Sequence, residues 1–107
     1  MPDFDLDKLA ALIAERARAG GDKSYTRKLL DEGVQKCAKK LGEEATETVV
    51  AALSGDKQAV ISETSDLLYH LLVVLESRGV KLADVYAELE RRTAQSGLEE
   101  KASRKSG

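Results

Sequence analysis

The sequence predicts an all-α protein, a bundle of four to five helices, on three observations. Apolar residues recur at helical spacing through most of the 107 residues, as they do in helices that bury one face. Proline is confined to Pro2, and the only aromatic residues are Phe4 and three tyrosines, so no β-sandwich or aromatic nucleic-acid platform is indicated. With 42% hydrophobic and 34% charged residues, the chain suits one small domain over residues 1–97 and a polar tail over 98–107.

Capping residues and glycines divide the first third of the chain into two helices. Asp3 or Asp5 can cap the first helix, and Gly20-Gly21 ends it. Ser24 can cap a short second helix over 25–32. We therefore expect one long helix and then a short one before the rest of the chain.

The rest of the chain carries three longer helical patterns. Gly33 either breaks the short helix from the next one, over about 34–53, or only kinks the two together. The segment 54–56 reads Ser-Gly-Asp, a C-terminal glycine followed by an N-capping aspartate. We expect a tight turn there, an antiparallel helix over about 57–78, and a last helix over about 82–95.

Two pairs of acidic residues flank this turn. Glu44 and Glu47 lie on one helix and Glu63 and Asp66 on the next, and each pair shares a helix face because its members are three residues apart. Glu47 and Glu63 are eight residues from Gly55, and Glu44 and Asp66 are eleven residues from it. In an antiparallel hairpin with Gly55 at its midpoint, four carboxylates fall at one level.

Four carboxylates at one level repel one another unless a cation lies between them. Mg²⁺ prefers oxygen ligands, and helix bundles build such sites from carboxylates on facing helices. Each pair taken alone would be read as solvated surface, and the coincidence of two pairs favours a Mg²⁺ site. Gly42, inside the first of these helices, either admits the close approach of a backbone or ligand or is a tolerated surface glycine.

The second helix of the hairpin is apolar nearly all round, which is typical of a buried helix. Glu63, Asp66 and His70 share one stripe on it, so we expect both carboxylates to face a polar pocket rather than bulk water. His70 is a partner of Asp66, a contact to substrate, or a histidine satisfied within the core. Because one small bundle hardly covers both apolar sides of this helix, we expect a homodimer.

Charge and composition argue against several classes of protein. The net charge of −2 argues against non-specific binding to nucleic acid. Cys37 is the only cysteine and lies on an apolar face, which predicts a core residue rather than a disulfide or a thiolate metal site. The sequence shows neither a signal peptide nor a membrane-length apolar run, so we expect a cytoplasmic protein without a membrane partner. It also lacks the two Glu-x-x-His motifs of a ferritin-like di-iron site and the glycine-rich motif of a P-loop.

The chain resembles the phosphoribosyl-ATP pyrophosphohydrolase family over residues 5–104, in five segments that occur in order: SYTRKLLDEG, KKLGEEATETVVAAL, ETSDLLYHLLVVL, ADVYAELERR and EKASR. This family belongs to the all-α NTP pyrophosphohydrolase superfamily, together with MazG-like proteins and dimeric dUTPases. The acidic signature, ExxE followed by ExxD, is loose alone. Combined with SYT, KxGEE and DLLYH it is specific.

The resemblance implies Mg²⁺-dependent hydrolysis of the α–β phosphoanhydride of N1-(5-phosphoribosyl)-ATP. The products are phosphoribosyl-AMP and pyrophosphate, and the reaction is the second step of histidine biosynthesis. The family's metal ligands carry over to Glu44, Glu47, Glu63 and Asp66. We expect Glu43, Glu44 or Glu47 to take the proton from the attacking water.

Basic side chains are expected to meet the phosphate charge of the substrate. Lys40 is best placed, one helical turn before the first acidic pair and on the same face. Arg27 and Lys28, on the short helix, come next, although Lys28 also suits a solvated surface. Lys101 and Arg104 rest on the resemblance of the EKASR segment alone.

Tyr25 either stacks on the adenine of the substrate or pins the loop before the short helix. Two other functions stay open on the sequence. One is a house-cleaning pyrophosphohydrolase that acts on ordinary or damaged nucleoside triphosphates, and substrate preference would separate it. The other is a non-enzymatic helical interaction module with an incidental acidic cluster, which should show no Mg²⁺-linked thermal shift.

Overall fold

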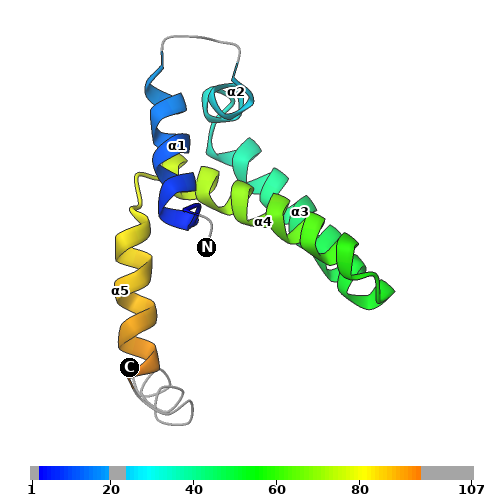
Figure 1. Cartoon of the computed structure of the whole chain (residues 1–107). Coiled ribbons are helices and arrows are strands. Elements are labelled where there is room, and N and C mark those ends of the chain that lie inside the picture. The colour runs from blue at the N-terminus through cyan, green and yellow to red at the C-terminus, as the bar shows by residue number, and fades with distance from the viewer. Residues whose placement is uncertain (1–2, 20–23, 95–107) are drawn as a thin grey trace.

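The computed structural model describes residues 3–19 and 24–94 of the chain. The described residues form five α-helices and no strand, which confirms the all-α prediction (Figure 1). The helices are α1 (Leu6–Arg18), α2 (Tyr25–Asp31), α3 (Val34–Ser54), α4 (Lys57–Ser77) and α5 (Leu82–Thr93). The tail predicted over 98–107, and with it Lys101 and Arg104, lies outside the described residues.

Side-chain caps set the beginnings of the first two helices, and a glycine separates the second from the third, much as the sequence predicts. The Asp5 side chain accepts a hydrogen bond from the backbone N–H of Lys8 at 2.9 Å and begins α1. Ser24 begins α2 in the same way, by accepting from the backbone N–H of Arg27 at 3.3 Å. Gly33 has a φ of 97°, so it breaks α2 from α3 rather than kinking one longer helix.

The predicted turn between α3 and α4 is confirmed. α3 ends at Ser54, Gly55 has a left-handed φ of 80°, and Asp56 caps α4 by accepting from the backbone N–H groups of Gln58 and Ala59 at 3.0 and 3.4 Å. The two helices have 21 residues each and run antiparallel, side by side (Figure 1). They form a long hairpin that projects from the rest of the molecule (Figure 1).

The core lies at the base of this hairpin, where α1 and α2 pack against α3 and α4 (Figure 1). Its most buried side chains are Ile13, Leu29, Cys37, Leu72 and Val73. Cys37 is therefore a core residue, as predicted, and its Sγ–H donates to the backbone oxygen of Leu29 at 3.3 Å. Burial raises the pKa of the Cys37 thiol, which suits packing rather than nucleophilic chemistry.

The last helix, α5, leaves this core and extends away from the other four helices (Figure 1). None of its side chains is buried, and Tyr86 and Leu89 are 40% and 53% exposed. Lys81, at its N-terminus, forms no side-chain hydrogen bond as a cap. In the described part of the chain, α1–α4 form the bundle and α5 stands beside it.

The outer half of the α3–α4 hairpin also exposes apolar side chains. Val49, Val50, Leu53 and Ile61 are each more than half exposed. Groups of exposed apolar side chains commonly mark surfaces that bind another protein. Among the described residues, no helix has the length and hydrophobicity needed to cross a membrane.

Candidate active site

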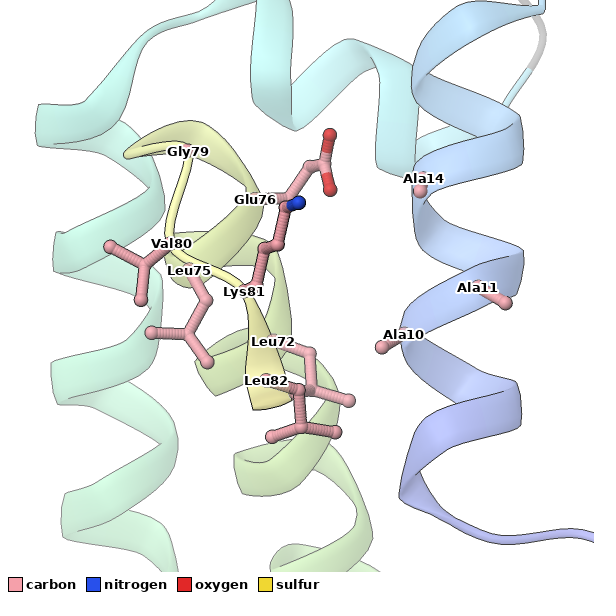
Figure 2. Close-up of a pocket in the computed structure, with 10 residues that line it drawn as sticks. All are labelled: Ala10, Ala11, Ala14, Leu72, Leu75, Glu76, Gly79, Val80, Lys81 and Leu82. Carbon is pink, nitrogen blue, oxygen red and sulfur yellow. The ribbon is translucent and has the colours of Figure 1, made fainter. Parts of the chain in front are cut away.

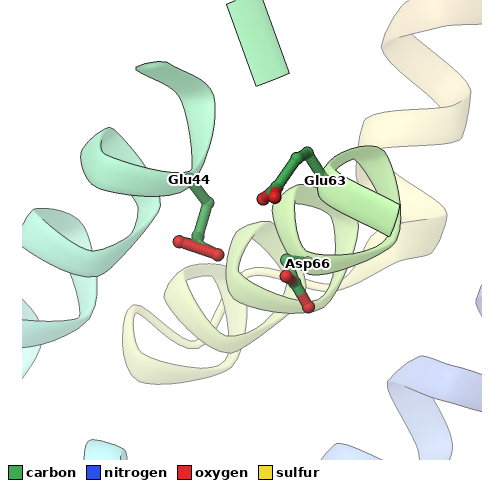
Figure 3. Close-up of side chains that lie close together, drawn as sticks. All are labelled: Glu44, Glu63 and Asp66. Carbon is green, nitrogen blue, oxygen red and sulfur yellow. The ribbon is translucent and has the colours of Figure 1, made fainter. Parts of the chain in front are cut away.

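The α3–α4 hairpin brings together three of the four predicted carboxylates. Glu44 on α3 points toward Glu63 and Asp66 on α4 (Figure 3), and one carboxylate oxygen of each lies within 4.8 Å of the other two. Glu44 is only 9% exposed, whereas Glu63 is half-buried and Asp66 is exposed. We call these three residues the carboxylate triad, and they lie at the level that counting from Gly55 predicts.

Glu47, the fourth predicted ligand, stands at the edge of the triad. Its side chain is close enough to help raise the pKa of Glu44, but it is exposed, and it is not one of the three residues that converge. It also lines, with Glu63, a hollow of about 430 Å³ between α3 and α4. Glu43 is paired with Lys40 at 3.2 Å, and its carboxylate is about half exposed. Metal binding by Glu47 and a catalytic role for Glu43 stay predictions.

The Glu44 carboxyl group has an unfavourable environment for its charge. Burial is the largest cause that raises the pKa of Glu44, to about 7, and the hydrogen bond with Glu47 and the charges of Glu47, Asp66 and Glu63 raise it further. A cation among these groups would remove the repulsion. Since the donors are carboxylate oxygens on two facing helices, the triad fits a hard divalent ion such as Mg²⁺.

Thr48 links the two helices at this level. Its hydroxyl oxygen lies 2.8 Å from the backbone oxygen of Glu44 and 3.1 Å from the backbone oxygen of Glu63 on α4. The hydroxyl hydrogen is shared between these two acceptors, so it joins the backbones of the two turns that carry the triad. Sequence reasoning missed this residue, because a helical threonine usually bonds only the carbonyl four residues earlier.

His70 lies one turn after Asp66 on α4 and is 7% exposed. Its Nδ1–H donates to the backbone oxygen of Asp66 at 2.8 Å, which leaves Nε2 to accept from the Tyr25 hydroxyl at 3.4 Å. Beside it, the Tyr69 hydroxyl hydrogen-bonds with Thr26, a fully buried residue. In the structure His70 is thus a buried histidine whose two ring nitrogens are satisfied by the Asp66 backbone and the Tyr25 hydroxyl, rather than a partner of the Asp66 carboxylate.

Three predicted substrate contacts line a hollow of about 620 Å³ beside α2 and α3. They are Tyr25, Lys28 and Lys40, and Lys36, which the sequence did not single out, lines it as well. The hydrogen bond with Glu43 is the main cause that raises the pKa of Lys40, so this side chain stays a cation. We call this space the lysine hollow.

Arg27, also predicted to contact the substrate, instead hydrogen-bonds with the end of α1. Its guanidinium donates to the backbone oxygens of Ala17 and Ala19 at 3.1 and 2.8 Å, and to Asp31 at 3.0 Å. These bonds satisfy carbonyl groups at the C-terminal end of α1 and tie α2 to it. A substrate contact by Arg27 stays a prediction.

Another hollow, of about 370 Å³, lies between α1 and the end of α4 (Figure 2). Small and apolar side chains such as Ala10, Ala14 and Leu72 line much of it, and its charged lining residues are Glu76 and Lys81. None of the predicted site residues borders it. The candidate chemistry is therefore concentrated at the carboxylate triad and the lysine hollow.

The site is therefore a cluster of carboxylates that converge from two antiparallel helices of an all-α protein, a donor set that would suit a divalent cation. The chain matches the family model of phosphoribosyl-ATP pyrophosphohydrolase over residues 6–93, and it belongs to that family. This confirms the resemblance found in the sequence.

Curated relatives are similar in sequence to this chain over nearly their whole length. The chain is 60% identical over 105 residues to a Bradyrhizobium diazoefficiens protein named phosphoribosyl-ATP pyrophosphatase 1, covering 98% of this chain and 99% of the relative. A Rhodopseudomonas palustris protein of the same name is 59% identical over 105 residues, covering 98% of each chain. An Azorhizobium caulinodans phosphoribosyl-ATP pyrophosphatase is 63% identical over 99 residues, covering 92% of this chain and 91% of the relative.

Proposed function

We propose that this chain hydrolyses phosphoribosyl-ATP to phosphoribosyl-AMP and pyrophosphate, the second step of histidine biosynthesis. The observation that carries the proposal is family membership over residues 6–93, and relatives at about 60% identity are named for this substrate. In the reaction, the oxygen of water bonds to the α-phosphorus and the bond from that phosphorus to the bridging oxygen breaks. Pyrophosphate leaves with the bridging oxygen.

Mg²⁺ is the proposed cofactor, with Glu44, Glu63 and Asp66 as its protein ligands. The support is the convergence of their oxygens within 4.8 Å and the raised pKa of Glu44, which a bound cation would reverse. Bound there, Mg²⁺ would neutralise phosphate oxygens and lower the pKa of a water molecule.

Glu47 is the residue that we assign to accept the proton of the attacking water. It lies near enough to Glu44 to raise the pKa of that carboxyl group yet is open to solvent, so it is beside the triad without being one of its three converging carboxylates. A carboxylate in that position can accept a proton while the triad holds the cation. Lys40, one turn before Glu44, supplies positive charge to the phosphate oxygens.

A homodimer is the proposed assembly. Its support is the exposed apolar surface on the outer half of the α3–α4 hairpin and on α5, which a second copy would cover. A single-chain mass by light scattering at micromolar concentration would contradict it. A cytoplasmic location is proposed on the ground that the substrate is a highly charged nucleotide, which does not cross membranes unaided.

Pyrophosphate release from phosphoribosyl-ATP tests the proposed activity. The purified protein is assayed with Mg²⁺ and with excess EDTA, beside a panel of deoxynucleoside triphosphates. Metal-dependent release with phosphoribosyl-ATP preferred supports the proposal. Preference for the deoxynucleoside triphosphates would assign a house-cleaning role instead. If the protein released pyrophosphate from none of these compounds, the remaining function would be that of a non-enzymatic interaction module.

Two variants separate metal binding from proton transfer. Glu63→Gln is expected to lose both turnover and the Mg²⁺-induced rise in Tm. Glu47→Gln is expected to lose about 100-fold or more in kcat while keeping that rise, because a general base contributes at least this much. Glu15→Gln, on the exposed side of α1, is the matched control and should keep both. A lost thermal response in Glu47→Gln would make Glu47 a ligand instead.

A further inference from the structure

The lysine hollow contains cationic side chains that the proposed hydrolysis does not use. Three lysines, Lys28, Lys36 and Lys40, line its volume of about 620 Å³, together with the aromatic ring of Tyr25. The attack of water on the α-phosphorus uses only the triad, Glu47 and Lys40. The positive charge of Lys28 and Lys36 is therefore left without a role.

Two acidic residues also line the hollow, but they compensate this charge only in part. Asp31 is already paired with Arg27 at 3.0 Å. The Glu32 carboxylate is 3.9 Å from Lys36 Nζ, which is a long separation between exposed partners, and such pairs stabilise little.

The lysines differ in what they already contact. Lys40 is paired at 3.2 Å with Glu43, which does not line the hollow. Lys28 has no ion pair or side-chain hydrogen bond with any described residue. Lys28 and Lys36 are thus the cations of the hollow that are most available to an anion.

The hollow adjoins the carboxylate triad along two paths. On α3, Lys40 precedes Glu44 by four residues, which is about 6 Å along the helix axis. On the other path, the hydroxyl of Tyr25 lies 3.4 Å from Nε2 of His70, whose Nδ1 is bonded to the backbone of Asp66. A ligand held at the triad can therefore extend past Lys40 and Tyr25 into the hollow.

The two available lysines each lie about one helical turn from a residue at that level. Lys36 precedes Lys40 by four residues on α3, and Lys28 follows Tyr25 by three residues on α2. Proceeding from the triad along α3, a ligand would pass Lys40, which lies near the Tyr25 ring, before it reached Lys36, and Lys28 lines the same hollow.

Tyr25 presents an accessible ring at the first of these levels. The Tyr25 side chain is 51% exposed. Its ring stacks with that of Tyr69 at a centroid separation of 6.3 Å and an interplanar angle of 19°, and its hydroxyl donates a hydrogen bond to Nε2 of His70. A ring that is held in this way and still accessible is a surface on which a nucleobase can stack.

Phosphoribosyl-ATP carries its groups in the same order. From the α-phosphorus, the molecule continues through ribose and adenine to a second ribose, on N1 of adenine, which ends in a 5-phosphate. The leaving pyrophosphate does not match this order, because no aromatic group separates it from the α-phosphorus. Of the anionic ends of the substrate, the second ribose phosphate fits the hollow better.

We propose that the lysine hollow binds the phosphate of the N1-linked ribose, with Lys28 and Lys36 contacting its oxygens. This inference rests on the proposed function and deepens it. ATP lacks this phosphate, so the two lysines are the residues that select phosphoribosyl-ATP over ATP.

Competitive inhibition by three probes tests the proposal. In the Mg²⁺-supported assay with phosphoribosyl-ATP, the probes are phosphoribosyl-AMP, AMP and pyrophosphate, and only the first carries the second ribose phosphate. Lys28→Gln and Lys36→Gln are each expected to raise the Ki of phosphoribosyl-AMP about tenfold, the loss of one charge-assisted hydrogen bond. The Ki values of AMP and pyrophosphate should stay at those of the unsubstituted chain. Lys39→Gln, on the exposed side of the same helix and outside the hollow, is the matched control.

Other outcomes overturn the proposal. An equal rise for phosphoribosyl-AMP and AMP would assign the lysines to the part that these molecules share. A rise for pyrophosphate alone would assign the hollow to the leaving group, and no rise for any probe would remove the lysines from binding. If the unsubstituted chain released no pyrophosphate from phosphoribosyl-ATP, the proposed function itself would fail, which is a separate result. Lys28→Arg should restore the Ki of phosphoribosyl-AMP, since it restores the charge.

Discussion

Replacing Glu44 by glutamine tests the electrostatic reading of the carboxylate triad. The substitution removes the charge and keeps the shape of the side chain. The pKa of Glu44 is raised from an ordinary 4.5 to about 7, so deprotonation is harder in the folded chain than in the unfolded one. At about 1.4 kcal/mol per pH unit, this difference amounts to at most about 3 kcal/mol, and solvent screening at the partly open triad brings the expected value to about 1–3 kcal/mol.

The sign follows from proton binding. Between about pH 4.5 and about pH 7, the folded chain binds more protons at Glu44 than the unfolded chain does, so metal-free stability falls as pH rises. Without Mg²⁺, the unsubstituted chain should lose about 1–3 kcal/mol relative to Glu44→Gln between pH 5 and pH 8. For a chain of this size, each kcal/mol corresponds to about 4–8 °C in Tm.

The assay is urea unfolding followed by far-UV circular dichroism, in EDTA, at fixed ionic strength and fixed protein concentration. The concentration is held constant because association of copies would add to the apparent stability. Glu43→Gln, whose carboxylate pairs with Lys40 outside the triad, should follow the unsubstituted chain at every pH. If Glu44→Gln and the unsubstituted chain lost stability in parallel from pH 5 to pH 8, repulsion between Glu44 and its acidic neighbours would not be the cause of that loss. Added Mg²⁺ should stabilise the unsubstituted chain at pH 8 and stabilise Glu44→Gln less.

Three further predictions concern residues around the site. Arg27→Gln removes the bonds to the carbonyl groups at the end of α1 and should lower the free energy of unfolding by about 1 kcal/mol; unchanged urea unfolding with a raised KM would instead assign Arg27 to the substrate. Thr48→Val removes the link between the two turns of the triad and should cost about 1 kcal/mol, with a measurable drop in kcat; an unchanged kcat would show that the link does not position the carboxylates. Gly42→Ala should raise the free energy of unfolding by about 0.5–1 kcal/mol, since a Cβ there meets no atom within 4 Å; an added loss of activity would indicate that a ligand approaches Gly42.

Much of the hairpin was predictable from sequence because its determinants are local. The left-handed Gly55 and the capping Asp56 are adjacent residues, and together they place the turn. Once the turn is placed, counting residues on two antiparallel helices of equal rise brings Glu44 level with Asp66. Caps at Asp5 and Ser24 were predictable for the same reason, since each bonds a backbone N–H only three residues away.

Other features depended on how the helices are rotated and packed against one another. The sequence put Glu44 and Glu47 on one face, and only the packing of α3 on α4 decided that Glu44 is buried in the triad and Glu47 stays exposed. The second acceptor of Thr48 lies on a different helix, so no local pattern contains it.

The sequence by itself determined the helices, the caps at Asp5, Ser24 and Asp56, and the central turn, because each follows from bonds between residues within about one helical turn. The level at which the carboxylates meet then follows from the equal rise per residue of two antiparallel helices. The tertiary structure alone decided that Arg27 ties α2 to the end of α1, that Lys28 and Lys36 share one hollow, and that α5 stands beside the bundle and extends away from it. These features join residues that are distant in the chain or set the direction of a whole helix, and the packing of side chains from several helices determines both.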